Sequence, residues 1–323
     1  MLRNTRKTGR GAKAADALLN RGFIREVRKN HALFVMVLPA FVFLIVFNYI
    51  PMYGIQVAFR KFNFMDGITK SPWVGLDNFK FYFNSKFFWQ TTFNTLFINV
   101  LTIVFWTFMA VSTAILISEI PGRRSKKIFQ TSMFFPYFIS WVVVSAFIRA
   151  LLNDRFGLVN NMITSMGGEG VPWLNIASIW PYMLAGIATW RGLGYSIVIY
   201  LAKIVGMDSE IIEAARVDGA NKWQEITMII LPGLKTTIVL LSLISLGQIF
   251  VADFGMIYSI IGDNGMLLPT TDVINTYIFR AMRLQGQFGI AAAVGLYQSV
   301  MGFALVLITN HIVRRHDKDM ALF

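Results

Sequence analysis

Six long stretches without Asp, Glu, Lys or Arg, one of them interrupted by a single arginine, constrain the fold of this 323-residue chain. A helix needs about 20 apolar residues to cross the hydrocarbon core of a bilayer. Each stretch must be helical there, because lipid offers the backbone no hydrogen-bond partner. Pro39, Pro51, Pro136 and Pro181 fall within or near them, so some helices should be kinked. The sequence therefore predicts an all-α membrane protein with six transmembrane helices. The stretches are 32–59, 87–118, 128–148, 178–202, 236–252 and 284–313.

The composition excludes several other classes of protein. Hydrophobic residues make up 55% of the chain and charged residues 15%, whereas soluble chains carry about 25% charged residues. Cysteine is absent, which excludes disulfides, thiolate metal sites and cysteine nucleophiles, and the three histidines are too scattered for a metal centre. The net charge is +13, and in a chain this apolar the expected acidic partner is the lipid bilayer and not nucleic acid.

The distribution of basic residues predicts the orientation in the membrane. With six spans both termini lie on one side, and the segments on that side carry 20 of the 30 Lys and Arg residues, against nine on the opposite side. Cytoplasmic loops carry such an excess, so both termini are expected in the cytoplasm. The expected organisation is a basic segment at 1–31, a transmembrane domain at 32–313 and a cytoplasmic tail at 314–323.

The N-terminal segment has a pattern of its own. Ala15, Leu19, Phe23 and Val27 recur every four residues beside arginines, which predicts an amphipathic helix on the anionic inner leaflet. A disordered basic tail is the alternative. The length of the basic leader and of the first apolar stretch argues against a cleaved signal peptide.

The loop between the fourth and fifth spans, residues 206–232, is the most informative segment. Asp208 or Ser209 is placed to cap a short helix. Gly219 stands where the chain must turn, a position that suits a positive φ. The loop is therefore predicted to form a compact helical projection on the cytoplasmic side.

A second short helix is predicted after this turn. Asn221, with Gln224 three residues later, has the spacing of a capping box, and Pro232 should end the helix. Four apolar side chains on the loop need a partner or the membrane to cover them. They are Ile211, Ile212, Val217 and Trp223.

Parts of this loop resemble the EAA signature of the permease subunits of binding-protein-dependent ABC importers for sugars. The matching parts are Glu213-Ala214-Ala215, Asp218-Gly219-Ala220 and Leu231-Pro232. Segments 73–79 and 94–95 resemble the outer loop of oligosaccharide permeases. Segments 51–54, 58–59 and 272–277 resemble the permeases that take up polysaccharide fragments, the group that includes the alginate importers.

The resemblance implies the ABC type I importer permease fold, with six transmembrane helices and cytoplasmic coupling helices. In that family the loop docks into a cleft on a separate ATPase subunit. By this analogy Glu213 would meet a basic residue of the ATPase, and Gly219 would allow the bend between the coupling helices. Without the resemblance, Glu213 would be interpreted as a solvated carboxylate on a helix surface.

The resemblance also implies the partners. They would be a second permease subunit, two ATPase subunits and an extracytoplasmic solute-binding protein in a bacterial cytoplasmic (inner) membrane. The chain has no Gly-x-x-x-x-Gly-Lys-Ser/Thr motif, so ATP and Mg²⁺ would bind to the partner ATPase subunits. This chain is then expected to need no cofactor and not to be an enzyme. Its substrate would be an oligosaccharide, preferably an acidic one built of alginate or other uronate units, moved by alternating access.

Arg191 is the only basic residue inside a predicted span, and such a charge usually faces a wet cavity. Its aromatic neighbours Trp190 and Tyr195 suit sugar rings, and a guanidinium can bind a carboxylate in bidentate fashion. Alternatively, Arg191 pairs with a carbonyl group or with the partner subunit. Gln248 and Gln298, in the fifth and sixth spans, either line the substrate path or bond neighbouring helices.

Two other functions compete with this interpretation. A carrier or channel that acts alone is the alternative, but the spans lack the central carboxylate that proton-driven carriers commonly use. An intramembrane enzyme would need a catalytic cluster, and the sequence contains no hydrolase motif such as Gly-x-Ser-x-Gly or His-Glu-x-x-His.

Overall fold

The structure, a computed structural model, describes residues 29–316. The amphipathic helix predicted around Ala15 to Val27 lies outside the described residues, as does most of the predicted tail. The chain divides into two compact units, residues 1–56 and 57–323.

The described part of the first unit is a single apolar helical run, which extends into the first residues of the second unit. It comprises α2 (His31–Leu44), the π-helical turn η1 (Ile45–Tyr49) and the 3-10 helix η2 (Ile50–Phe59). The run of 29 residues is long and apolar enough to cross a bilayer, which agrees with the first predicted span.

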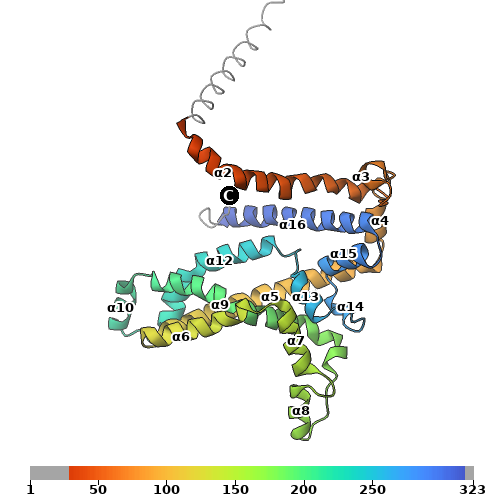
Figure 1. Cartoon of the computed structure of the whole chain (residues 1–323). Helices are drawn as coiled ribbons and strands as arrows, with labels where there is room; N and C mark the ends of the chain where they lie inside the picture. Colours follow the sequence, from red (N-terminus) through yellow and green to blue (C-terminus); the bar gives the residue numbers. More distant parts are fainter. Residues whose placement is uncertain (1–28, 317–323) are drawn as a thin grey trace, which may run out of the picture. The chain divides into compact units, whose positions relative to one another are not determined.

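The second unit consists of long helices joined by short ones (Figure 1). The long helices are α5 (Lys86–Glu119), α9 (Trp180–Val205), α12 (Leu231–Gly247) and α16 (Phe288–His316). The shorter helices before α9 are α3 (Gly67–Lys70), α4 (Asp77–Phe83), α6 (Arg123–Phe134), η3 (Phe135–Phe138), α7 (Trp141–Leu152), α8 (Leu158–Ser165), η4 (Trp173–Asn175) and η5 (Ala177–Ile179). Those after α9 are α10 (Ser209–Val217), α11 (Lys222–Glu225), the π-helical turn η6 (Ile226–Ile230), α13 (Phe254–Ile260), α14 (Leu268–Thr271) and α15 (Ile274–Arg283).

The number of spans agrees with the sequence. Within residues 29–316, five helical segments are long and apolar enough to cross a membrane, and a sixth is obtained if one bent pair of helices counts as a single span. The five are His31–Phe59, Lys86–Glu119, Ala177–Val205, Lys222–Gly247 and Phe288–Arg315. The predicted all-α membrane fold is therefore confirmed.

The bent pair corrects the third predicted span, 128–148, which is not one continuous helix. The helical segment formed by α6 and η3 ends at Phe138, and α7 begins at Trp141 (Figure 1). The two segments are bent by 96° relative to each other. Pro136 in η3 has no backbone N–H and its ring disturbs the helix geometry, so it explains why the helix breaks here. The kink expected from Pro136 is present, but it is sharp enough to turn α7 away from α6.

The fifth span also differs from the prediction of 236–252. The helix starts at Lys222, runs without a stop through η6 and ends at Gly247. The expectation that Pro232 ends the second loop helix is wrong. Pro232 lies in the first turn of α12, directly after the π-helical turn, whose wider hydrogen-bond pattern can accommodate a residue without an N–H.

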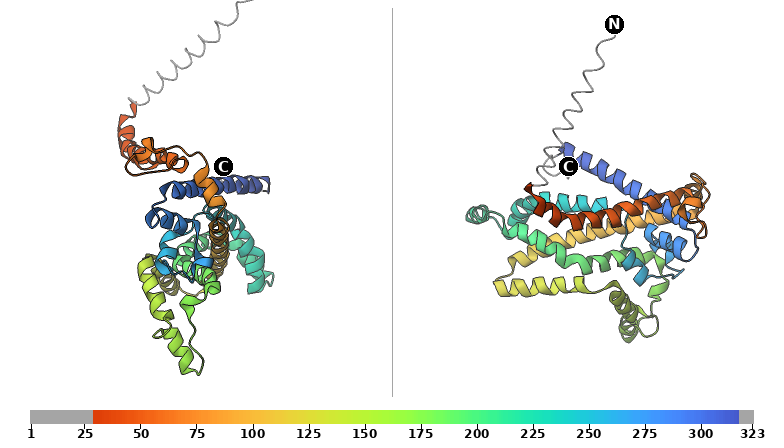
Figure 2. Two further views of the ribbon diagram at one scale, coloured as in Figure 1. Left: turned by 90° about the vertical axis from the view of Figure 1, so that its right-hand side faces the viewer. Right: turned by 45° about the horizontal axis from the view of Figure 1, so that its top comes forward.

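Helices α5 and α9 pack along each other and form the centre of the second unit. Small residues allow the close approach: Ala110 and Ala114 on α5 are fully buried, and Gly192 on α9 lies directly against the ring of Trp106. Helix α6 also packs beside α9 (Figure 2, right). Many apolar side chains of α5 and α16, among them Phe108, Leu116 and Phe303, are exposed, as expected where lipid covers them.

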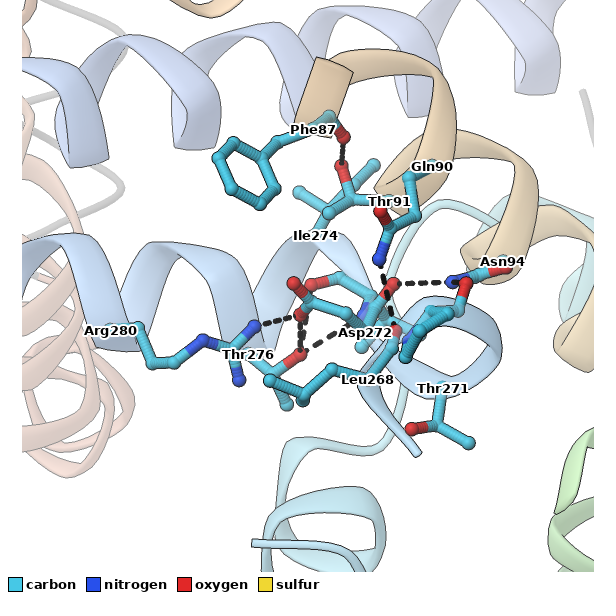
Figure 3. A network of polar contacts seen from close by, with 12 residues as sticks. Phe87, Gln90, Thr91, Asn94, Leu268, Thr271, Asp272, Ile274, Thr276 and Arg280 are labelled. Atoms are coloured by element: carbon cyan, nitrogen blue, oxygen red, sulfur yellow. Dashed lines mark hydrogen bonds and ion pairs between the residues drawn. The ribbon is translucent and has the colours of Figure 1, made fainter. Parts of the chain in front are cut away.

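A buried polar network fixes the segment 268–280 to the start of α5 (Figure 3). Asn94 donates a hydrogen bond to the backbone oxygen of Asp272 (3.0 Å), and the backbone N–H of Ile274 donates to the hydroxyl of Thr95 (2.9 Å). The Asp272 carboxylate is buried and forms an ion pair with Arg280. These contacts give the Asp272 to Tyr277 motif a structural role, because they fix this segment to α5.

Candidate functional site

The 206–232 loop forms two short helices at one end of the second unit, as the sequence predicts (Figure 1). The Asp208 side chain caps α10. Gly219 has a φ of 86° in the turn after α10, a conformation that side chains disfavour. Asn221 and Gln224 form the predicted capping box through hydrogen bonds of 3.0 and 2.8 Å. Each local conformation thus follows from the residue type at that position.

The EAA residues lie on the outer surface of this loop. Four of them are exposed, namely Glu213, Ala214, Asp218 and Gly219, and the other two, Ala215 and Ala220, are half-buried. Three apolar side chains of the loop are also exposed: Ile211 by 57%, Val217 by 87% and Trp223 by 73%. Large exposed apolar side chains next to charged residues are typical of a protein-protein contact surface.

A group of charged residues fastens the two loop helices together. Arg216 on α10 binds the Glu225 carboxylate through two hydrogen bonds of 3.1 and 2.9 Å, and Lys222 lies 3.2 Å from the same carboxylate. The hydrogen bond to Glu225 raises the pKa of Arg216 above its ordinary value. Lys222 also forms an ion pair of 2.6 Å with Glu119, the last residue of α5. The loop is therefore a stiff unit with a tie to a second transmembrane helix.

Arg191 holds the break in the third span. Its Nε donates a hydrogen bond of 2.8 Å to the backbone oxygen of Ile139, a carbonyl at the break between η3 and α7. Its guanidinium carbon lies 4.3 Å from the ring centroid of Trp141 and 5.8 Å from that of Tyr137. Of the two predicted alternatives, the pairing with a carbonyl is what the structure contains. This contact uses one of the five N–H donors of the guanidinium group.

Trp141 connects this break to a second one. Its indole N–H donates a hydrogen bond of 2.8 Å to the Asp253 carboxylate, which also caps α13. Asp253 ends the non-helical segment 248–253 that follows α12. The break in the third span and the non-helical segment after the fifth span are therefore cross-linked. Interrupted helices at membrane depth are where many transporters bind their substrates.

Gln298 bonds neighbouring segments of the bundle, which is the second of the two roles proposed for it. Its buried side chain donates hydrogen bonds to the backbone oxygen of Phe250 and to the side chain of Asn275 (2.8 Å). The same Asn275 oxygen accepts a hydrogen bond from the backbone of Ala252, and Asn99 donates one to Ile249. Side-chain amides thus replace the lost helical hydrogen bonds of segment 248–253.

A cavity of about 560 Å³ lies between α5, α9, α12 and η3. Tyr195 and Gln248, two of the predicted path residues, line it, whereas Trp190, Arg191 and Gln298 do not. The stacked rings of Tyr137 and Tyr195, with centroids 5.9 Å apart, form part of its wall. Aromatic faces and amide groups in one cavity can bind a sugar ring through stacking and hydrogen bonds.

Sequence reasoning missed several of these residues. Lys222 and Glu225 have the spacing of a helical ion pair, which was a usable signal. Glu119 simply ends an apolar stretch, and nothing local indicates that it meets Lys222. Trp141 looks like any aromatic residue of a span, and its link to Asp253 joins residues that are far apart in the sequence.

The family described as the inner membrane component of binding-protein-dependent transport systems matches residues 107–318. The polygalacturonan/rhamnogalacturonan transport system permease protein of Bacillus subtilis (strain 168) is 32% identical over 317 residues, which cover 95% of this chain and 97% of the relative.

Solved structures give a similar result. A chain of a bacterial ABC transporter involved in the import of the acidic polysaccharide alginate has a TM-score of 0.83 and 32% sequence identity, over 91% of this chain and 98% of that chain. A bacterial alginate ABC transporter in complex with an alginate pentasaccharide-bound periplasmic protein has a TM-score of 0.82, with the same identity and coverage.

Proposed function

Because the chain belongs to the family of inner membrane components of binding-protein-dependent transport systems and is a permease of an ABC importer, we propose that it imports oligosaccharides containing uronate units. It is a multi-pass protein of the inner membrane, and in this proposal both termini lie in the cytoplasm. A carrier or channel that acts alone is not favoured, because permeases of this family serve importers with further subunits.

The similarity over nearly the whole chain to a permease chain of an alginate importer carries the substrate proposal. The Bacillus relative, a permease for polygalacturonan and rhamnogalacturonan, supports the same substrate class, since polygalacturonan and alginate are both chains of uronic acids. The shared chemistry is a row of sugar rings that each carry a carboxylate. Alginate oligosaccharides are the preferred candidate substrates, and oligogalacturonates are the second candidates.

The partners follow from the same premise. The exposed surface around Glu213, Val217 and Trp223 would dock on one of two ATPase subunits, which would bind ATP and Mg²⁺. A second permease subunit would complete the translocation path, and a solute-binding protein would deliver the oligosaccharide from outside. The permease itself would then have no ATPase site and no cofactor.

Closure of the ATPases would move the 206–232 loop and open the path outward, and hydrolysis would reverse the movement.

Uptake by the reconstituted complex tests the substrate. We expect proteoliposomes with both permeases, the ATPases and the binding protein to accumulate labelled alginate trisaccharide only when ATP is enclosed. Oligogalacturonate and a neutral maltotriose serve as comparison substrates. Preference for maltotriose over both uronate oligomers would contradict the proposed substrate class.

The Arg191→Gln substitution tests the role of the span arginine in this path. Hydrogen bonds to charged groups contribute about 1.5–3 kcal/mol, so loss of a guanidinium-carboxylate contact should lower alginate uptake at limiting substrate about tenfold or more. Arg191→Lys, which keeps the charge but not the planar fork, should recover only part of the activity. Arg149→Gln, at an exposed arginine on α7, is the matched control. Unchanged uptake by Arg191→Gln would exclude Arg191 from substrate binding.

A further inference from the structure

We propose that four charged residues, Glu119, Arg216, Lys222 and Glu225, pass the movement of α10 directly to the start of the fifth span and to α5, in addition to α9, which precedes α10 in the chain. We call these residues the ionic cluster. The inference rests on the proposed function, because it assumes that α10 receives its movement from an ATPase. It assigns a positioning role to side chains outside the EAA signature.

Glu225 is the centre of the ionic cluster. Its side chain is only 3% exposed, although it lies in a surface loop. A buried carboxylate is costly unless it is paired, and Glu225 is paired with two cations, Arg216 at 2.9 Å and Lys222 at 3.2 Å. The two parallel contacts from Arg216 also fix the orientation of the groups, which a single contact would not do. Helix α10 is thereby held to the first turn of the helix that continues into α12.

These contacts bypass the turn between the two loop helices. Along the backbone, movement of α10 can reach α11 only through residues 218–221, where Gly219 adopts a positive φ. A turn centred on glycine is the most deformable part of this path. The Arg216-Glu225 contact spans the turn directly, so α10 and the start of the fifth span move together.

Lys222 extends the connection to α5. Its ammonium group lies between two carboxylates, Glu225 of the loop and Glu119 at the end of α5. Helix α5 packs along α9 through the buried core of the second unit, so movement at Glu119 is passed to the helices that surround the cavity. The Lys222-Glu119 ion pair links the loop to this second helix, in addition to the apolar cluster that Ile117 of α5 shares with Ile226 and Ile230.

Because Lys222 and Glu119 are partly exposed, a positioning role for their ion pair can be tested separately from a stabilising role. The side chains of Lys222 and Glu119 are 55% and 34% exposed, and ion pairs with this exposure contribute little to folding stability. Removal of the pair should therefore leave the fold and assembly intact. If the pair transmits movement, its loss should still change the efficiency of coupling.

A double-mutant cycle on the assembled importer tests the proposal. Glu119→Gln removes the charge of the ion pair with α5 and keeps the contacts of Glu225. Lys222→Met removes both contacts of the lysine, and the double variant combines them. Lys222→Arg is the conservative rescue, and Lys235→Met removes an exposed lysine from α12 as the matched control. The readouts are alginate trisaccharide taken up per ATP hydrolysed and the midpoint of thermal unfolding.

We expect uptake per ATP to fall about tenfold in Glu119→Gln and Lys222→Met, as is typical of coupling between distant sites. The unfolding midpoint of Glu119→Gln should shift by no more than about 3 °C, whereas Lys222→Met also removes one of the two cations paired with the buried Glu225 and should be less stable. The double variant should be no worse than Lys222→Met, because both changes break the same contact. Lys222→Arg and Lys235→Met should behave like the wild type.

Results against the role of the ionic cluster differ from results against the proposed function. Unchanged uptake per ATP in Glu119→Gln, or losses that multiply in the double variant, would overturn the proposed role of the ionic cluster. If Lys222→Met failed to assemble, Glu119→Gln and Lys222→Arg would still decide the question. A wild-type complex that hydrolyses ATP without moving any oligosaccharide would instead contradict the proposed function.

Discussion

Glu213→Lys is expected to abolish the ATP hydrolysis that the loaded binding protein stimulates in the assembled importer. Glu213 is exposed on α10, one turn before the exposed side chain of Val217 on the same face of the helix. A carboxylate in this position would meet a basic group on the ATPase, and a lysine there would place like charges together. Like charges across an interface cost several kcal/mol, so the stimulated rate should fall at least about a hundredfold.

The controls for this variant come from the same helix. Glu210→Lys makes the same change of charge one turn earlier on α10, and it should retain most of the stimulated hydrolysis. Glu213→Gln removes the charge without reversing it and should have an intermediate rate. Copurification of the ATPase measures assembly, which the apolar contacts should preserve at high protein concentration. Normal stimulated hydrolysis by Glu213→Lys would remove Glu213 from the docking surface.

Gly194→Ala is expected to prevent correct folding of the permease. A Cβ atom at this position would lie 2.5 Å from the Cα of Phe134 and close to the backbone of Met133, so backbone and not a flexible side chain would have to move. Helix α6 and η3 pack on α9 here, beside the break that Arg191 holds. Overpacking usually costs 1–3 kcal/mol, and contact with rigid backbone should bring the cost to about 3 kcal/mol or more.

Gly186→Ala is the matched control on the same helix. An added Cβ there meets no atom within 4 Å, and alanine has a higher helix propensity than glycine by about 1 kcal/mol in a helix interior. The unfolding midpoint of the purified permease should therefore stay the same or rise in Gly186→Ala and fall sharply in Gly194→Ala. Equal midpoints for the two variants would show that α6 and α9 do not pack as closely as described.

The spans and the 206–232 loop were predictable because their signals are local. An apolar stretch identifies a span by its own length, and the caps of the two loop helices depend on residues within one turn, such as Asp208 and Asn221. The positive φ of Gly219 follows in the same way from the residue type.

The errors have a common physical cause. Hydropathy does not detect a change of direction inside an apolar stretch, so the bend at residues 139–140 was visible only as a proline at 136. The continuous helix through Pro232 depends on a π-helical turn, which has no simple sequence signal. Expecting helix up to 252 failed because amide groups from other helices, including Asn99 and Gln298, stabilise the unwound segment.

Uptake by vesicles with a defined set of subunits tests most directly whether this chain depends on a separate ATPase for its energy. Vesicles that contain this permease and its partner permease, without ATPase subunits, should accumulate no labelled alginate trisaccharide against a gradient. Addition of the ATPases, the binding protein and enclosed ATP should start accumulation. Accumulation at the same rate without the ATPase subunits would contradict the account, because the chain would then be a carrier with an energy source of its own.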